Sequence, residues 1–238
     1  MPRDTWRSLD PVHIISTAAR LERRIRERFP DASLARLAAE LHEVAREAAE
    51  RTTAMRRPNW WLRMGVGIMA GALLILVAAA AAGLQGGPAV REWGPLVQTV
   101  ESTINDLVFI GIAVVFLLSL ERRLQRRREL RAIHELRSIA HIVDLHQLTK
   151  DPDRLRHDLP DTASSPDRPL GPVALARYLD YCSELLSLTG KIAAIYGEGI
   201  DDPVVLGAVQ QVEALATGLS HKIWQKIMIL DAATAPGA

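Results

Sequence analysis

The stretch from Met64 to Leu84 reads MGVGIMAGALLILVAAAAAGL and contains no ionisable side chain over its 21 residues. A helix needs about 20 apolar residues to cross a hydrocarbon core of ~30 Å, so this run is long enough to form a membrane span. A second uncharged run, LVFIGIAVVFLLSL, covers 14 residues from Leu107 to Leu120. It spans only if Asn105 and Asp106 lie in the headgroup region. Together the two runs predict a two-helix transmembrane hairpin.

Positive charge gathers at both outer ends of this predicted hairpin. Arg56, Arg57 and Arg63 precede the first run, whereas the connecting loop, from about residue 85 to 103, contains one arginine. Basic residues accumulate in the short cytoplasmic flanks of membrane spans, so we expect both termini in the cytoplasm and the loop outside. Five arginines after the second run are expected to contact anionic lipid headgroups: Arg122, Arg123, Arg126, Arg127 and Arg128.

The composition limits which cellular compartments and which classes of partner are expected. Residues 1–57 are charged throughout, so we interpret the first run as a retained anchor rather than as a signal peptide. Cys182 is the sole cysteine, which rules out an intrachain disulfide. The net charge of +1 gives no support for a nucleic-acid partner. Arginine outnumbers lysine 25 to 4, as in GC-rich bacterial genomes, and we expect a bacterial inner membrane protein.

The rest of the chain predicts helices without strands, so the expected fold class is all-α. No proline lies between Pro95 and Pro152, which favours one long helix from the outer leaflet into the cytoplasm. In chain order, the expected regions are a cytoplasmic helical hairpin (1–58), the transmembrane hairpin (59–121), a helical stalk (122–149), a linker (150–172) and a second cytoplasmic helical hairpin (173–238). An apolar seam at helical spacing marks the first of these regions: Leu34, Leu37, Leu41, Val44 and Ala48.

One part of the stalk carries a polar stripe that allows two interpretations. At 100° per residue, His134, Arg137, His141 and Asp144 share one side of a helix. Such a set can hold a metal ion or transfer a proton if other residues complete the site. It can also hydrogen-bond between packed helices or face water, and we favour this structural interpretation. The stripe misses the zincin pattern because Ser138 stands where the second histidine is needed. We expect no metal and no cofactor.

Small and aromatic residues indicate two kinds of contact. Gly67 and Gly71 form a small-xxx-small pair in the first run, and Gly111 lies in the second. Such surfaces let helix backbones approach closely, either between the two spans or between subunits. In the last predicted hairpin, four aromatic residues can anchor a protein interface or complete the internal core: Tyr178, Tyr181, Tyr196 and Trp224.

These features favour a non-enzymatic membrane protein that presents cytoplasmic helices for self-association or partner binding, as a scaffold or adaptor does. The expected partners are membrane lipids, further copies of the chain and a cytoplasmic protein. The alternative is a small channel or transport-associated subunit, in which several hairpins surround a pore. A weaker alternative is a metal-dependent or acid–base enzyme that uses His134, His141 and Asp144. The sequence contains no P-loop, nucleophile elbow or dinucleotide fingerprint, so the expectation leans away from an enzyme.

Overall fold

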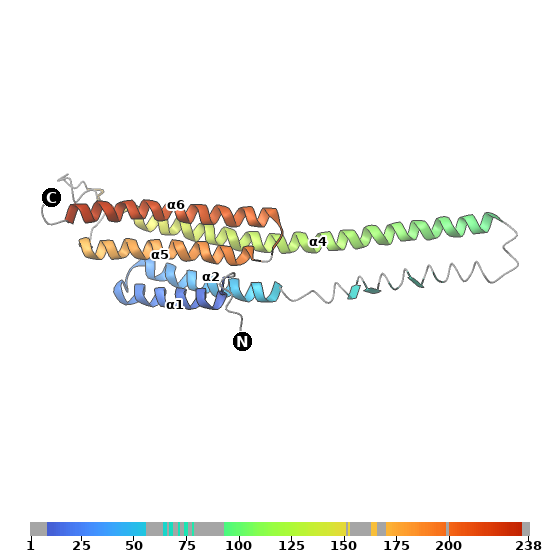
Figure 1. Ribbon diagram of the computed structural model, residues 1–238, viewed down its shortest axis with the longest axis horizontal. Helices are drawn as coiled ribbons and strands as arrows, with labels where there is room; N and C mark the ends of the chain where they lie inside the picture. The colour runs from blue at the N-terminus through green and yellow to red at the C-terminus, as the bar shows by residue number, and fades with distance from the viewer. Residues whose placement is uncertain are drawn as a thin grey trace. The chain divides into compact units, whose positions relative to one another are not determined.

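The computed structural model of the protein is all-helical over the residues that it describes, and no strand occurs among them. These residues are 9–55, 93–150, 152, 163–165, 170–198 and 200–234, together with Met64, Gly65, Gly67, Ile68, Gly71, Leu74, Ile75 and Ala78. The helices are α1 (Pro11–Arg28), α2 (Ser33–Met55), α4 (Trp93–Leu148), α5 (Pro172–Gly197) and α6 (Pro203–Thr234), labelled in Figure 1. The predicted fold class is therefore confirmed at the level of all-α.

The chain divides into two compact units. The bundle unit combines Met1–Met55 with Arg126–Ala238, and the apolar unit is Arg56–Gln125. Helix α4 contributes its Arg126–Leu148 part to the bundle unit and its earlier part to the apolar unit.

Local sequence signals account for the first helical pair of the bundle unit. The Asp10 carboxylate accepts a hydrogen bond of 2.9 Å from the Val12 backbone N–H, and Pro11 occupies the first helical position, so α1 begins there. The helix ends before Phe29 and Pro30. One apolar stripe of α1 is buried, as are most of the seam residues of α2, and the two helices pack on each other and on α5. The buried residues of the two stripes are Ile14, Ala18, Leu21, Ile25, Leu34, Leu37, Leu41 and Ala48.

Helices α5 and α6 form the most extensive contact of the bundle unit and run in opposite directions (Figure 1). Gly190 of α5 faces α6: a methyl group on its Cα would lie 3.8 Å from the Ala216 Cβ, an ordinary van der Waals contact. At the start of α6, the Asp202 carboxylate accepts hydrogen bonds from the backbone N–H groups of Val204 (2.9 Å) and Val205 (3.4 Å). This N-cap fixes the point at which the chain re-enters a helix.

The Arg126–Leu148 part of α4 is a core helix of the bundle unit. Its apolar stripe is buried: Ala132, Ile133, Leu136, Ile139, Ala140 and Val143. Two long-range ties give its direction, because Arg126 contacts Asp202 at the start of α6 while the Gln147 carbonyl contacts Lys226 near its end. Thus α4 and α6 run in parallel, and α5 lies antiparallel to both (Figure 1).

The long helix that was predicted between the prolines is observed, with one difference at its start. Helix α4 begins at Trp93, two residues before Pro95, and ends at Leu148. Proline is compatible with the first turn because backbone N–H groups there have no partner within the helix.

The predicted membrane spans are supported in part. Among the described residues, one helix, Ile104–Leu148, is long and apolar enough to cross a membrane, and its most apolar window is not buried. The predicted span Leu107–Leu120 lies in that helix. The predicted span Met64–Leu84 lies largely outside the described residues, although the eight that are described are helical and exposed. The pairing of the two runs in a hairpin stays a prediction.

Candidate functional site

The polar stripe of α4 lies on the outside of the bundle unit. His134, Arg137 and His141 are exposed, whereas Asp144 is half-buried. The Asp144 carboxylate accepts a 2.6 Å hydrogen bond from the side-chain amide of Gln147, one turn further along α4. Across the described residues, no group of three or more histidine, cysteine, aspartate or glutamate side chains is arranged to hold a metal ion. The four residues therefore share one face of α4, but they do not form a complete set of ligands for a metal ion.

Three of the four predicted interface aromatics lie in the core of the bundle unit. Tyr178, Tyr181 and Tyr196 are almost fully buried along α5. Phe29, at the end of α1, meets Tyr178 and Tyr181 edge-on, with ring centroids 5.5 and 6.2 Å apart. Burial raises the pKa of the Tyr178 and Tyr196 hydroxyls, so both stay protonated at neutral pH. The Tyr178 and Tyr181 rings therefore join α1 to α5, and burial places all three tyrosines in the core rather than at an exposed interface.

The buried thiol of Cys182 has low reactivity. Burial raises its pKa to about 12, although the nearby charges of Lys226 and Lys150 act in the opposite direction. The thiolate is the reactive form of cysteine, and it is scarcely populated at neutral pH when the pKa is this high. The position fits a core residue rather than a nucleophile.

Helix α6 presents an exposed face without formal charge. Trp224 is 60% exposed and Met228, one turn later, is 51% exposed. The same face extends toward the start of the helix, where exposed residues recur at alternating steps of four and three. Its members are Gln210, Ala214, Thr217, His221, Trp224 and Met228. We call these six residues the α6 outer face. It has the spacing of a helix-packing seam, with small side chains at one end and large ones at the other.

The arginines of the predicted lipid-facing cluster are exposed, and one of them has a protein partner. The Nε atom of Arg126 donates to the Asp202 carboxylate at 2.5 Å, within the bundle unit. Arg122 and Arg123 belong to the apolar unit. The expected contact of the cluster with lipid stays a prediction.

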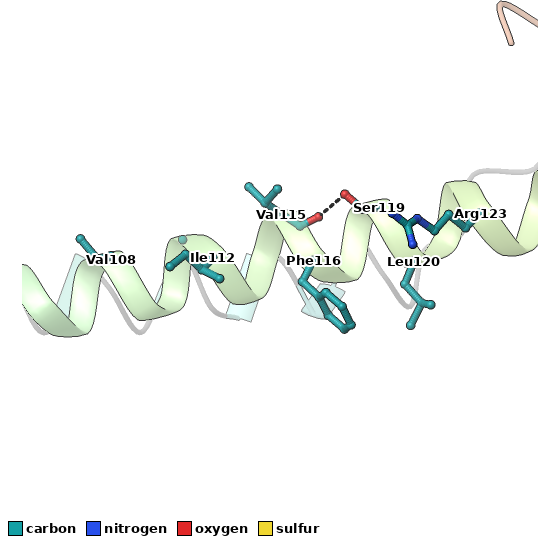
Figure 2. A pocket seen from close by; sticks show the side chains of 8 residues that line it. Val108, Ile112, Val115, Phe116, Ser119, Leu120 and Arg123 are labelled. Atoms are coloured by element: carbon teal, nitrogen blue, oxygen red, sulfur yellow. Dashed lines mark hydrogen bonds between the residues drawn. The ribbon is translucent and has the colours of Figure 1, made fainter. Parts of the chain in front are cut away.

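A hollow of about 600 Å³ lies along one face of α4 in the apolar unit (Figure 2). Its lining residues recur at steps of three and one: Val108, Gly111, Ile112, Val115, Phe116, Ser119, Leu120 and Arg123. The Ser119 hydroxyl donates to the Val115 carbonyl at 2.7 Å, so its hydrogen-bonding need is met within the helix. The hollow is therefore apolar along its length and carries a cation at its end.

The glycines predicted to mediate helix packing have open space beside them in the described structure. A methyl group added to Gly67, Gly71 or Gly111 would meet no described atom within 4 Å. Gly111 is part of the wall of the hollow. Close packing through these glycines stays a prediction.

A second hollow, on the surface of the bundle unit, is rich in arginine but balanced in charge. It measures about 550 Å³ and is lined by Arg24, Glu27, Arg28, Arg177 and Tyr181. The Nη1 and Nη2 atoms of Arg24 each donate to an oxygen of the Glu184 carboxylate, at 2.9 and 3.2 Å, and Arg177 pairs with Asp180. These carboxylates reduce the attraction of this surface for an anionic ligand.

Comparison with known proteins adds no assignment: no family model, no curated protein and no solved structure matches the chain.

The structure does show features that the sequence interpretation missed. The α6 outer face was signalled by the uncharged residues at three-and-four spacing opposite the buried stripe of α6. The position of Arg123 at the end of an apolar hollow has no comparable signal, because it depends on the shape of the surface.

Proposed function

We propose that the protein is a two-span integral membrane protein of a bacterial inner membrane, with both termini in the cytoplasm, that presents its helical bundle as a scaffold or adaptor. The bundle associates with a second copy or with a cytoplasmic protein through the α6 outer face. The protein performs no chemistry of its own in this proposal.

The composition of the bundle unit supports an even number of membrane crossings. Helices α1 and α2 precede the apolar unit and α5 follows it, yet they pack together. Arg24 of α1 binds Glu184 of α5, and the Leu9 N–H donates to the Glu198 carboxylate at 2.6 Å. Segments that pack in one bundle must lie on the same side of a membrane. If α4 crosses it once, a second crossing is needed, and Met64–Leu84 has the length and composition for it.

The exposed apolar surface of the apolar unit supports its insertion in a membrane. Large side chains of α4 are exposed on several sides of the helix, including Val108, Phe109, Ile112, Val115 and Phe116. Water-soluble proteins rarely expose contiguous apolar patches of more than a few hundred Å². A bilayer removes that cost, and the arginines that follow the span favour a cytoplasmic exit.

The observation that carries the scaffold proposal is the α6 outer face, where Trp224 and Met228 are exposed one turn apart. Tryptophan is enriched among the residues that dominate interface energetics, and a charge-free face avoids the desolvation of buried ions. The neighbouring small residues Ala214 and Thr217 leave room for side chains of a partner helix.

Photo-cross-linking in native membranes tests this proposal. A benzoylphenylalanine placed at Gln225, beside Trp224, is expected to give a discrete adduct in the full chain. An adduct of twice the chain mass indicates self-association, and any other discrete mass indicates a different protein. The same probe at Val173, which is exposed on α5, serves as the control position.

Truncation of the anchor side chain provides the second part of the test. Trp224→Ala should reduce the adduct at position 225 at least tenfold, whereas Val173→Ala should leave it unchanged. Equal adducts at both probe positions, or an adduct insensitive to Trp224→Ala, would contradict the scaffold proposal. Ion conductance of the reconstituted chain without any partner would favour the channel alternative instead.

A further inference from the structure

The hollow along α4 ends at a cation that has no carboxylate partner among the described residues. Some arginines on helix surfaces pair with acidic side chains, as Arg24 does with Glu184 and Arg126 does with Asp202. Arg123 makes no such pair, although it lines the hollow together with Leu120 and Ser119. A cation at the end of an apolar surface is complementary to an anion attached to an apolar chain.

The direction of the Arg123 side chain strengthens this complementarity. Figure 2 shows it running back along the helix toward Ser119, as long side chains on helices generally do. Its charge therefore lies over the end of the apolar wall rather than beyond it. The guanidinium group binds phosphate oxygens through two parallel N–H donors, which a compact ammonium group cannot do.

The length of the hollow fits an acyl chain. From Val108 to Arg123 the helix advances by 15 steps of 1.5 Å, about 22 Å in all. An acyl chain that reaches the middle of a bilayer extends about 15 Å, half of the ~30 Å hydrocarbon core. Gly111 lines the hollow without a side chain, and Phe116 and Ile112 add large apolar contact surfaces.

We propose that this hollow is a binding site for one anionic phospholipid. Its acyl chain lies against the Val108–Leu120 face, and its phosphate is held by Arg123. The inference rests on the membrane insertion proposed above. It goes beyond general attraction of the arginine cluster to lipid, because it assigns one arginine and one apolar wall to a single lipid molecule.

Native mass spectrometry of the full chain in mild detergent tests the charge at the site. With dioleoyl phosphatidylglycerol and dioleoyl phosphatidylcholine as probes, we expect the first bound lipid to favour phosphatidylglycerol about fivefold, the contribution of one interfacial basic residue. Arg123→Gln should abolish this preference. Arg122→Gln, which removes the same charge one position away and outside the hollow, should retain it. A preference that survives Arg123→Gln, or an equal loss in both variants, would overturn the assignment.

A second pair of variants tests the apolar wall. Gly111→Phe places a ring in the hollow and should weaken binding of both lipids about tenfold, the cost of exposing about two buried methylene groups. Ala113→Phe adds the same ring to an exposed position outside the lining and should have no such effect. Unchanged lipid binding in Gly111→Phe would overturn the proposal. A third variant tests whether a second copy of the chain fills the hollow instead. The double variant Val115→Cys, Cys182→Ser carries a single cysteine in the hollow. If it forms disulfide-linked dimers and binds no lipid, a second copy occupies the hollow and the proposal is overturned.

Alkaline carbonate extraction separates failure of this inference from failure of the proposed function. A chain that stays in the membrane pellet but shows no Arg123-dependent lipid preference disproves the lipid site alone. A chain released into the supernatant disproves membrane insertion, and the lipid site with it.

Discussion

At the scale of single residues, polar side chains tie α4 to α6 at both ends of their shared length. Arg126 contacts Asp202 at one end. At the other end, the Lys226 ammonium donates to the carbonyls of Gln147 (2.9 Å) and Lys150 (3.4 Å). The sequence did not predict either tie, because the partners are 76 to 79 residues apart and each side chain alone is an ordinary surface residue. Only the packed bundle brings them together.

The Asp202 carboxylate should make stability depend on pH. Burial alone raises its pKa, but the hydrogen bonds from Arg126 and from the backbone of Val204 and Val205 outweigh that effect and lower it. A carboxyl whose pKa is lower in the folded state stabilises the fold above the unfolded value, about 3.9, and loses this effect as pH falls through the folded value. Asp202→Asn keeps the helix cap and removes the charge. At pH 7 we expect its Tm to be lower than that of the natural chain.

Thermal unfolding at several pH values checks this prediction. The Tm difference between the natural chain and Asp202→Asn should shrink as the pH falls below the unfolded value of about 3.9, and should vanish once the folded carboxyl is protonated. Asp202→Ala, which also loses the cap, should retain a deficit at every pH. A difference independent of pH would mean that the charge of Asp202 does not contribute.

Lys226 should stabilise the end of α4. Its ammonium group lies at the C-terminal carbonyls, where the helix dipole is negative. Lys226→Met keeps much of the apolar stem and should lower the free energy of unfolding by about 1–2 kcal/mol, measured by urea denaturation. Lys222→Met changes an exposed lysine on the same helix and should have an effect within about 0.5 kcal/mol. Equal effects of the two variants would disprove a specific role for Lys226.

At the scale of helices, periodicity predicted most of what is observed. The Asp10-Pro11 start of α1, its end near Phe29-Pro30 and the buried stripe of α4 all follow from capping and three-and-four spacing, because both are local properties of the chain. The burial of Tyr178, Tyr181 and Tyr196, and the exposure of Trp224, do not follow. An aromatic residue satisfies an internal core and an interface equally well, and the arrangement of neighbouring helices decides between them.

The two faces of α4 should differ sharply in their tolerance of truncation. Leu136 is fully buried and Leu145 is 61% exposed. Leu136→Ala should lower the free energy of unfolding by about 2–5 kcal/mol because it leaves a cavity in the core. Leu145→Ala should change it by less than about 0.5 kcal/mol. Urea denaturation followed by circular dichroism measures both. Similar values for the two variants would mean that Arg126–Leu148 does not pack in the bundle as described.

At the scale of the whole molecule, the bundle unit constrains any path of the chain through a membrane. It is assembled from residues before and after the apolar unit, so a chain that crosses a membrane within that unit must cross it an even number of times. Charge distribution leads to the same prediction independently, because arginines flank both outer ends of the apolar runs. The two arguments use different properties of the chain, packing in one case and charge in the other.

Single cysteines at Ser8, Ala89 and Ala233, in a Cys182→Ser background, test this topology in intact cells with a membrane-impermeant thiol reagent. We expect labelling at position 89 and protection at positions 8 and 233. Labelling at one terminus alone would indicate an odd number of crossings, which is incompatible with α1 and α5 packing in one bundle. Protection at all three positions, followed by labelling of all three after the cells are opened, would mean that the chain does not cross the membrane. The hairpin would then be wrong, and the exposed apolar surface of α4 would need a protein partner instead of lipid.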